Sequence, residues 1–439
     1  MSFLEFAEFF TDPVLRGPTL GSFFQALTTS LIGVLVFLRK ETLLGESLSH
    51  ATYPGLILGL LVGLFFPADG LLQMAWPLVF AALSALLALK VANFLTDRIK
   101  LRSDTVLALI LSSFFGMGVL LVSALQHSFG SLYKKGEALL LGQAATMQDA
   151  HIWFYAFLFL AVLFFIILLK KEIVSFLFDR PFSKVLGLPT HWLQRGFQLF
   201  FLIAIVAGIR SAGVVLVSSL LIAPPLTASL LTSRFASFCT VSAIVGGLSA
   251  IIGTIFSTEA TAYFVSKFHE RVILPTGPCI ALVLSLFALF AILFAPKKGY
   301  FAQQFRILSH RYRRLEENLL KFLWRRGNHG AAKEEMEETF PLPSLFLLFA
   351  LYKMQRGKLV THKEGQWFLS VEGQKRATRV VRLHRLWELY LVDILGKQRD
   401  EVHVTAEEME HILTPELEER LITLLKDPTL DPHKQPIPK

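Results

Sequence analysis

Long apolar runs fill the first two thirds of the chain, and the polar positions between them are few and clustered. The runs lie at roughly residues 20–38, 50–67, 72–94, 105–126, 151–170, 196–224, 236–258 and 276–296. Runs of this length cross the ~30 Å hydrocarbon core of a bilayer as helices. The run 196–224 is too long for one ordinary span and is interrupted at residues 208–213, which predicts two short helices joined by a turn. The pattern predicts an all-α polytopic membrane domain of about nine spans over residues 1–298.

A more polar pattern begins after residue 298 and predicts a second domain. The expected elements are a charged linker (299–314), a helix with apolar residues at 315, 319, 320 and 323, short helices near 331–339 and 344–358, and two strands around a turn at 363–365. Helix, helix, helix, hairpin is the order of an α+β winged helix-turn-helix, here over residues 315–377. The order also fits a three-helix adaptor. A helical domain is expected over residues 378–439.

The composition agrees with a membrane protein that carries a soluble part. Hydrophobic residues make up 53% of the 439 positions, and the mean hydropathy is +0.54. The only cysteines, Cys239 and Cys279, lie in apolar runs, so a disulfide framework is not expected and a thiolate metal site is disfavoured. No GxxxxGK[ST] phosphate-binding loop occurs, so the chain is not expected to bind ATP or to be an enzyme.

The basic clusters predict the orientation in the membrane. With nine spans and the N-terminus outside, one side collects Arg39 and Lys40, Arg98 with Lys100 and Arg102, Lys170 and Lys171 with Arg180, Lys184 and Arg195, Arg234, and Lys297 with Lys298. Lys and Arg concentrate on the cytoplasmic side of membrane proteins. The soluble part is therefore expected in the cytoplasm, with Lys134 and Lys135 as the exception to the pattern.

Glu46 and His50 are the residues that stand out within the apolar part. They are four residues apart, so they share one face of a helix at the start of the second apolar run. Ionisable side chains inside a membrane segment are costly and mark transport pathways by default. An interfacial pair that caps a helix is the alternative interpretation.

Three stretches carry a resemblance to a known family. "FLRKETLLGESLSHATYPGLILG", "AGVVLVSSLLIAPPLTASLLTSRF" and "LPTGPCIALVLSLFALFAILFAPKKG" resemble, in this order, the permease subunits of ATP-binding-cassette importers for zinc, manganese and iron. The resemblance covers about residues 15–298 and implies that Glu46 and His50 line the metal path. It also implies a cytoplasmic segment that contacts the ATPase through Pro224, Pro225, Leu226, Thr227, Ala228, Leu231 and Arg234.

The resemblance implies the partners and the location as well. The expected partners are a separate ATP-binding subunit, an extracytoplasmic metal-binding protein, a second permease subunit that is identical or related, and the lipid bilayer of a bacterial inner membrane. Permeases for vitamin B12 and siderophores share the architecture of broken helices. The Glu46/His50 pair argues against such cargo, because a chelated metal needs no direct protein ligands.

A second resemblance covers about residues 310–438. "VVRLHRLWELYLVDILGKQRDEVHVTAEEMEHIL" and the closing "DPHKQPIP" resemble the diphtheria-toxin-type iron- and manganese-dependent repressors. The resemblance implies an ancillary metal site of His384, Glu388 and His403, and a primary site of Glu407, Glu410 and His411 with Glu317 from the first helix. The spacings i,i+4 and i,i+3,i+4 let each set share a helix face. Without the resemblance, such groups are more often a solvated face.

The ligand types bear on the metal. Iron-sensing members carry Cys where this chain has Glu407, and carboxylates with imidazole suit Mn²⁺ or Fe²⁺ better than a soft-ligand zinc site. Zn²⁺ remains the alternative, because the general affinity order favours it.

The DNA-binding part departs from the family's pattern. The expected recognition helix, residues 344–355, is rich in Leu and Phe where the relatives carry polar residues that reach base edges, so no base-reading residues are assigned. Phosphates of operator DNA would be contacted by Lys353, Arg356, Lys358 and Lys363. The chain thus resembles the permease–repressor fusions of obligate intracellular bacteria. The competing hypothesis is a cytosolic gate that binds metal and inhibits transport directly, without binding DNA.

Overall fold

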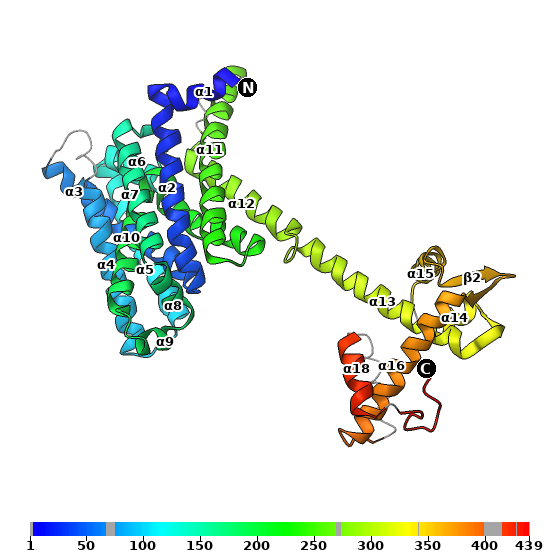
Figure 1. Ribbon diagram of the computed structural model, residues 1–439. Coiled ribbons are helices and arrows are strands. Elements are labelled where there is room, and N and C mark those ends of the chain that lie inside the picture. The colour runs from blue at the N-terminus through cyan, green and yellow to red at the C-terminus, as the bar shows by residue number, and fades with distance from the viewer. Residues whose placement is uncertain are drawn as a thin grey trace. The chain divides into compact units, whose positions relative to one another are not determined.

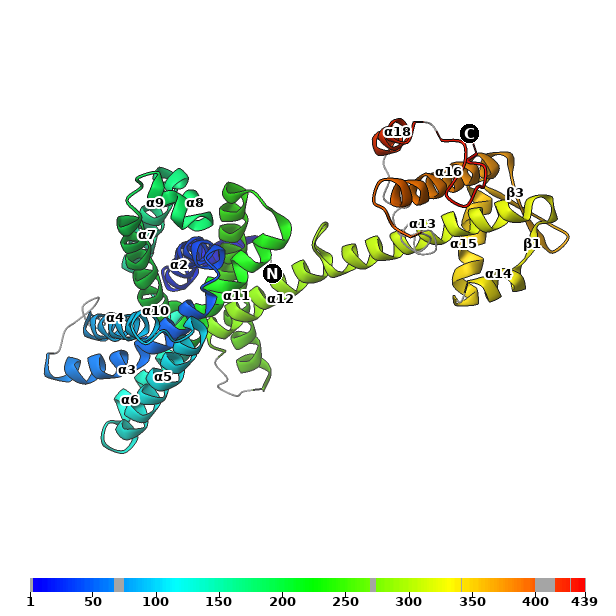
Figure 2. The same ribbon diagram turned by 90° about the horizontal axis from the view of Figure 1, so that it is seen from below.

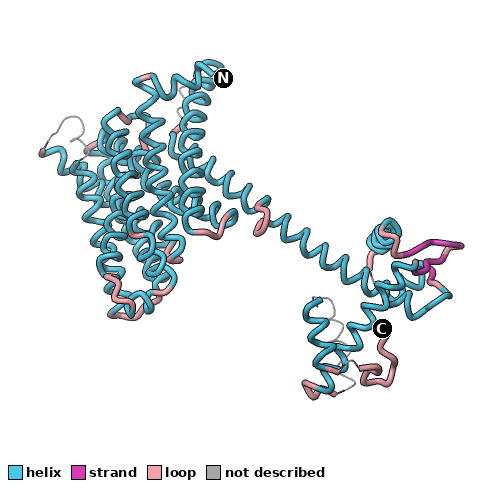
Figure 3. The backbone as a smooth tube through the Cα atoms, in the orientation of Figure 1, coloured by secondary structure: helices cyan, strands magenta, loops and turns pink. Residues whose placement is uncertain are grey.

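The computed structural model describes residues 3–66, 75–268, 274–340, 342–398, 415–426 and 428–438. It divides into two compact units, Met1–Ala302 and Gln303–Lys439. Throughout the described residues of the first unit the secondary structure is helical, and strands occur in the second unit (Figure 3). The predicted order of a helical membrane domain and an α+β domain is confirmed.

The membrane unit is a bundle of long helices (Figure 1). Its α-helices are α1 (Phe3–Thr11), α2 (Pro13–Leu38), α3 (Thr42–Phe65), α4 (Ala75–Asp97), α5 (Ser103–Ser128), α6 (Gly130–Leu141), α7 (Asp149–Leu168), α8 (Lys170–Phe178), α9 (Arg180–Val185), α10 (Thr190–Leu231), α11 (Phe235–Phe268) and α12 (Thr276–Phe294). Within the described ranges, eight helices are long and apolar enough to cross a membrane. The position of the ninth predicted span is taken by the shorter apolar helix Leu216–Leu231, which at 1.5 Å per residue is about 24 Å long.

Helix α2 lies inside the bundle, among α7, α10 and α11 (Figure 2). Small polar side chains fill its buried faces, including Thr19, Ser22, Thr28, Thr29 and Ser30. Within a bilayer the hydrophobic effect does not drive helices together, because lipid is itself apolar. Small residues let the helices approach closely enough for van der Waals packing. Gln25 ties α2 to α10, because its Nε2 donates to the carbonyl oxygen of Ala204 at 3.2 Å.

The long α10 is broken at one residue. Gly213 has φ +81° and ψ 165°, a conformation that glycine alone adopts without strain. A Cβ there would also lie 2.3 Å from the carbonyl oxygen of Leu140, so the end of α6 fits against the break. The predicted interruption at 208–213 therefore reduces to Gly213, and the preceding residues continue the helix.

A second irregularity in α10 lets α2 approach. Pro225 has no N–H to bond the carbonyl oxygen of Leu221 in the helical ladder. That oxygen faces Gly33 of α2, where an added Cβ would lie 2.2 Å from it. A proline on one helix and a glycine on the other thus bring the two backbones into direct contact.

The C-terminal unit has the predicted order of elements. They are α13 (Tyr300–Arg326), β1 (Ala331–Ala332), α14 (Lys333–Thr339), α15 (Ser344–Arg356), β2 (Val360–Lys363), β3 (Gln366–Leu369), α16 (Val371–Asp393) and α18 (Pro415–Leu424). Leu319, Leu347, Leu351 and Met354 are fully buried in the core beneath α13 and α15. Residues 300–314, predicted as a linker, lie within α13.

The hairpin is built by its turn. Glu364 and Gly365 both have positive φ (48° and 76°), as the tight turns that suit twisted antiparallel strands require. Strand β3 pairs with β2 on one side and with β1 on the other, in the order β1-β3-β2. The two-residue β1 was not predicted, because two residues carry no readable alternation.

Candidate metal sites

Glu46 and His50 lie in α3, as predicted. His50 is 9% exposed, and its ring packs edge-on against Phe115 with the centroids 4.8 Å apart. Its Nδ1 is buried without a hydrogen-bond partner among the described residues. Since buried polar atoms are almost always paired, such an atom indicates a position for a ligand.

The backbone of α3 adds an oxygen at the same place. Pro54 stands four residues after His50 and has no N–H for the carbonyl oxygen of His50. Ser49 Oγ donates to the carbonyl oxygen of Val214, just past the break in α10, and Ser84 Oγ donates to that of Ala51 at 2.6 Å. The histidine is thus held between neighbouring helices, with a ring nitrogen and a carbonyl oxygen as potential metal donors.

The segment predicted to contact an ATPase is the end of α10 and the turn after it. Pro224, Pro225, Thr227 and Ala228 are buried, and Leu226 is half-buried. Leu231, which is 49% exposed, and Arg234 face outward. Lys298 contacts the same segment, since its Nζ donates a hydrogen bond to the carbonyl oxygen of Ser229 at 2.7 Å. Leu231 and Arg234 are therefore the members of the predicted set that a partner is able to reach.

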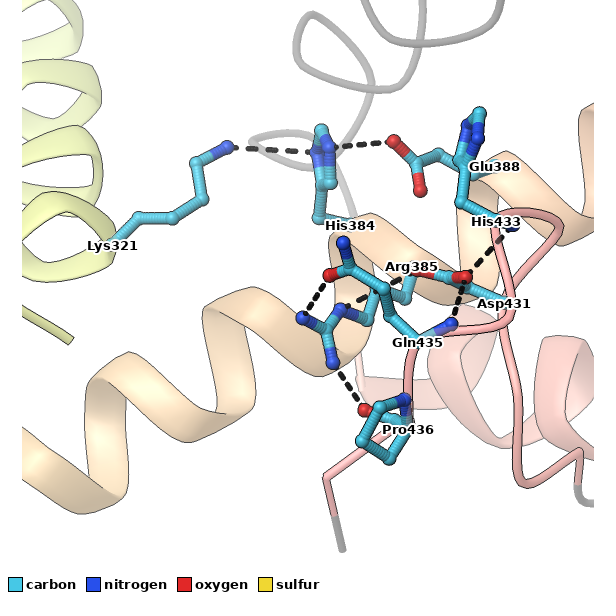
Figure 4. Close-up of polar contacts among 8 residues, drawn as sticks. All are labelled: Lys321, His384, Arg385, Glu388, Asp431, His433, Gln435 and Pro436. Carbon is cyan, nitrogen blue, oxygen red and sulfur yellow. Dashed lines mark hydrogen bonds and ion pairs between the residues drawn. The ribbon is translucent and has the colours of Figure 1, made fainter. Parts of the chain in front are cut away.

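His384 and Glu388 lie one turn apart on α16, which begins at the N-cap Ser370, whose Oγ accepts the N–H of Gly373 at 2.9 Å. The Nε2 of His384 lies 2.9 Å from Oε1 of Glu388 (Figure 4). The two residues are 8% and 2% exposed. The structure therefore brings together these two predicted ligands of the ancillary site in a buried position.

Lys321 of α13 lies on the other side of the imidazole. Its Nζ is 3.5 Å from Nδ1 of His384, and Lys321 is 6% exposed (Figure 4). A second contact joins the same two helices, where Arg376 of α16 pairs with Glu316 of α13 at 2.9 Å. The predicted site on α16 is thus linked directly to α13, the first helix of the C-terminal unit.

The chain's last described residues close over this site. Asp431 Oδ1 accepts the N–H groups of His433 and Gln435 at 2.9 and 2.7 Å, which fixes a turn. Arg385 of α16 holds the turn, because its Nη2 donates to Oε1 of Gln435 at 2.8 Å and its Nη1 to the carbonyl oxygen of Pro436. Its Nε lies 3.6 Å from Oδ2 of Asp431. The motif "DPHKQPIP" therefore forms a polar wall next to His384.

Between the wall and the helices is a pocket of about 240 Å³. Its polar lining residues are Lys321, Arg325, His384, Arg385, Glu388, Asp431, His433 and Gln435. An imidazole and a carboxylate side by side are donors that Mn²⁺, Fe²⁺ and Zn²⁺ all accept. No group of three His, Cys, Asp or Glu with metal-binding geometry occurs in the part of the chain that the structure describes. Among the described residues, the predicted ligands brought together here are His384 and Glu388.

The other predicted ligands are placed as follows. His403, Glu407, Glu410 and His411 lie outside the described residues. Glu317 of α13 is 8% exposed, and its Oε1 accepts Nε of Arg313 at 3.2 Å. Sequence reasoning missed Lys321, Asp431 and His433, and the "DPH" motif was the available signal for the latter two.

The predicted phosphate contacts Lys353, Arg356, Lys358 and Lys363 are all exposed. Lys353 Nζ lies 3.8 Å from the ring centroid of Tyr312, a cation–π contact that joins the last turn of α15 to α13. Burial, with neighbouring Glu316, raises the pKa of Tyr312, so the phenol stays neutral. On the outer face of α15, Leu345 and Phe349 are exposed, in agreement with the apolar helix that the sequence predicts.

Comparisons with known proteins agree with both units. A family model for the ABC 3 transport family matches residues 11–295, and one for the iron dependent repressor, metal binding and dimerisation domain, matches residues 370–439. The chain is 35% identical over 442 residues to a probable metal transport system membrane protein of Chlamydia trachomatis serovar D, with 98% of this chain and 97% of the relative covered.

Two further relatives extend the comparison. The manganese transport system membrane protein MntC of Bacillus subtilis is 27% identical over 413 residues, which cover 92% of this chain and 90% of the relative. The solved structure of PsaBC from Streptococcus pneumoniae in complex with Fab shares the fold, with a TM-score of 0.56 at 21% identity over 69% of this chain and 100% of that chain. The chain belongs to the ABC 3 transport family and ends in a domain that matches the metal-binding and dimerisation domain of the iron-dependent repressors.

Proposed function

We propose that the chain is the permease subunit of an ATP-binding-cassette importer for a divalent metal, and that its C-terminal unit is a metal-dependent DNA-binding repressor that senses the imported metal. Membership of the ABC 3 transport family supports the first part. The relatives from Chlamydia trachomatis and Bacillus subtilis match nearly the whole length of this chain, and their names describe a metal transport protein and a manganese transport protein. The buried His384–Glu388 pair carries the second part.

The transport path runs through α3 in this proposal. A hydrated divalent cation needs oxygen and nitrogen ligands within the membrane, and Glu46 with the ring nitrogen and carbonyl oxygen of His50 supplies them. The N-terminus lies outside and the C-terminal unit lies in the cytoplasm of a bacterium, as the basic clusters predict. An ATP-binding subunit binds at Leu231 and Arg234, an extracytoplasmic protein delivers the metal, and a second permease subunit completes the importer.

The sensor takes Mn²⁺ or Fe²⁺ in preference to Zn²⁺, because no thiolate occurs in the proposed ligand sets. His384 and Glu388 with His403 hold the ancillary metal, and Glu407, Glu410 and His411 with Glu317 hold the primary one. The primary metal supplies positive charge that joins α13, through Glu317, to the rest of the unit. Operator DNA then binds through Lys353, Arg356, Lys358 and Lys363, whose phosphate contacts carry no sequence information.

The test is DNA binding by the full-length protein in nanodiscs. Fluorescence anisotropy follows its binding to the promoter region of its own operon during titration with Mn²⁺, Fe²⁺ or Zn²⁺. We expect metal to strengthen binding, and we expect His384→Ala and Glu388→Gln to remove the response. His329→Ala is the matched control, since His329 is exposed and lies outside the pocket. Metal binding without any effect on DNA binding would refute the repressor function.

A further inference from the structure

The stretch around the start of α13 is strongly basic. Residues 297–314 contain six Lys or Arg and no Asp or Glu. These residues are Lys297, Lys298, Arg306, Arg311, Arg313 and Arg314. The stretch begins just after α12, which ends at Phe294 and is the last helix in the described residues that is long and apolar enough to cross a membrane.

The same stretch carries an exposed apolar stripe. Phe301, Phe305 and Leu308 are spaced i, i+4, i+7, so they share one face of α13, and they are 52%, 74% and 52% exposed. Further along this face, Tyr312 packs against Phe349 and Leu315 is buried in the core of the C-terminal unit. Every residue from 303 to 311 is exposed. The stripe is thus covered by protein from Tyr312 onward and is uncovered before it, as far as the described residues extend.

Basic residues occupy the other side of this part of the helix. At 100° per residue, Arg306, His310 and Arg313 lie on the face opposite the stripe. A helix with an apolar stripe on one side and basic residues on the other lies in the plane of a membrane interface, where the basic residues meet anionic headgroups. The five residues 295–299 that connect α12 to α13 span at most ~18 Å even when fully extended. The stripe therefore begins close to the bilayer that α12 crosses.

We propose that residues 300–311 form an interfacial helix on the membrane that α12 spans. Phe301, Phe305 and Leu308 enter the boundary between headgroups and acyl chains, and Arg306 and Arg311 bind the anionic headgroups. A second copy of the chain is the competing occupant of the stripe. Pairing of two copies would bring together two segments that each contain six Lys or Arg and no Asp or Glu, although Arg313 pairs with Glu317, so the segments would repel each other. An anionic lipid surface is instead complementary in charge.

The test uses the full-length protein in vesicles of phosphatidylethanolamine and phosphatidylglycerol. Both native cysteines are buried, so Cys239→Ala and Cys279→Ala give a background for labelling. An environment-sensitive NBD dye is attached at Phe305→Cys, and at Gln303→Cys as the matched control on the other face. We expect a blue-shifted emission at position 305 and quenching by nitroxide-labelled lipids at least about threefold stronger than at position 303.

Each other outcome counts against the proposal. Equal quenching at positions 303 and 305 would show that the helix does not lie in the interface with its stripe inward. A blue shift at 305 without quenching by lipid would show that protein, such as a second copy, covers the stripe. Replacing phosphatidylglycerol by phosphatidylcholine should reduce the quenching at 305, as should the double variant Arg306→Gln/Arg311→Gln. Unchanged quenching in both cases would overturn the role of anionic headgroups.

Discussion

At His384, the hydrogen bond with Lys321 and the ligation of a metal through Nε2 would compete for the same imidazole. A lysine ammonium has only donors, so the Nδ1 that faces Lys321 must be the acceptor, and the ring proton then lies on Nε2 beside Glu388. A metal bound at Nε2 by a neutral imidazole leaves the proton on Nδ1. Nδ1 then no longer accepts from Lys321. A metal held at Nε2 would therefore replace this contact between α13 and α16.

Replacing Lys321 by Met removes this competing hydrogen bond and a positive charge next to the site. We expect Lys321→Met to tighten Mn²⁺ binding at least about fivefold, since a hydrogen bond of a charged group is worth about 1.5–3 kcal/mol. Isothermal titration of the full-length protein in nanodiscs measures the change. Lys333→Met is the matched control, since Lys333 pairs with Glu337 outside the pocket. Weaker or unchanged Mn²⁺ binding by Lys321→Met would contradict the competition.

The buried Nδ1 of His50 leads to a prediction about metal uptake. We expect His50→Ala to reduce uptake of radiolabelled Mn²⁺ at least about tenfold, because loss of a metal ligand or of its support typically costs 10–100-fold. Glu46→Gln should act in the same direction. His127→Ala is the control, since His127 is exposed near the end of α5. Uptake is compared at equal amounts of protein in the membrane, and normal uptake by His50→Ala would exclude the α3 path.

At the scale of elements, the sequence predicts those features that leave a local pattern in the chain, such as hydrophobic periodicity and turn residues. The helices, the hairpin and the pairing of His384 with Glu388 follow from spacing and from the two resemblances. The break in α10 was predicted over six residues but occupies only Gly213, because which glycine takes a positive φ depends on the end of α6 packed against it. Lys321 was missed, because a contact over 63 residues leaves no local pattern.

The contact between α2 and α10 gives a prediction at this scale. A methyl group at Gly33 would meet the carbonyl oxygen of Leu221 at 2.2 Å, and backbone on both sides leaves little room to relax. We expect Gly33→Ala to cost about 1–3 kcal/mol, the usual range for overpacking. Gly63→Ala is the control, because nothing lies within 4 Å of a Cβ there. Thermal unfolding in detergent should show a lower Tm for Gly33→Ala alone, and equal Tm values would disprove the tight approach.

At the scale of the whole molecule, the proposed import path and the proposed sensor occur once each in the same chain. Sensors and permeases are then made in a fixed ratio, so the number of sensors follows the import capacity. The sensor binds cytoplasmic metal whatever its route of entry, so a defect in import and a defect in sensing must differ when the external metal concentration changes. This difference separates a repressor from a gate, because a gate alters uptake and leaves transcription unaffected.

A transcriptional reporter on the promoter of the chain's own operon measures this difference in cells. At low external Mn²⁺ we expect the unmodified chain to repress the reporter and both His50→Ala and His384→Ala to leave it active. At high external Mn²⁺, where metal enters by other routes, His50→Ala should regain repression, since its sensor is intact. With His384→Ala the reporter should stay active at every external Mn²⁺ concentration, since the sensor cannot respond to the metal. Equal repression by all three proteins would show that the C-terminal unit does not regulate transcription.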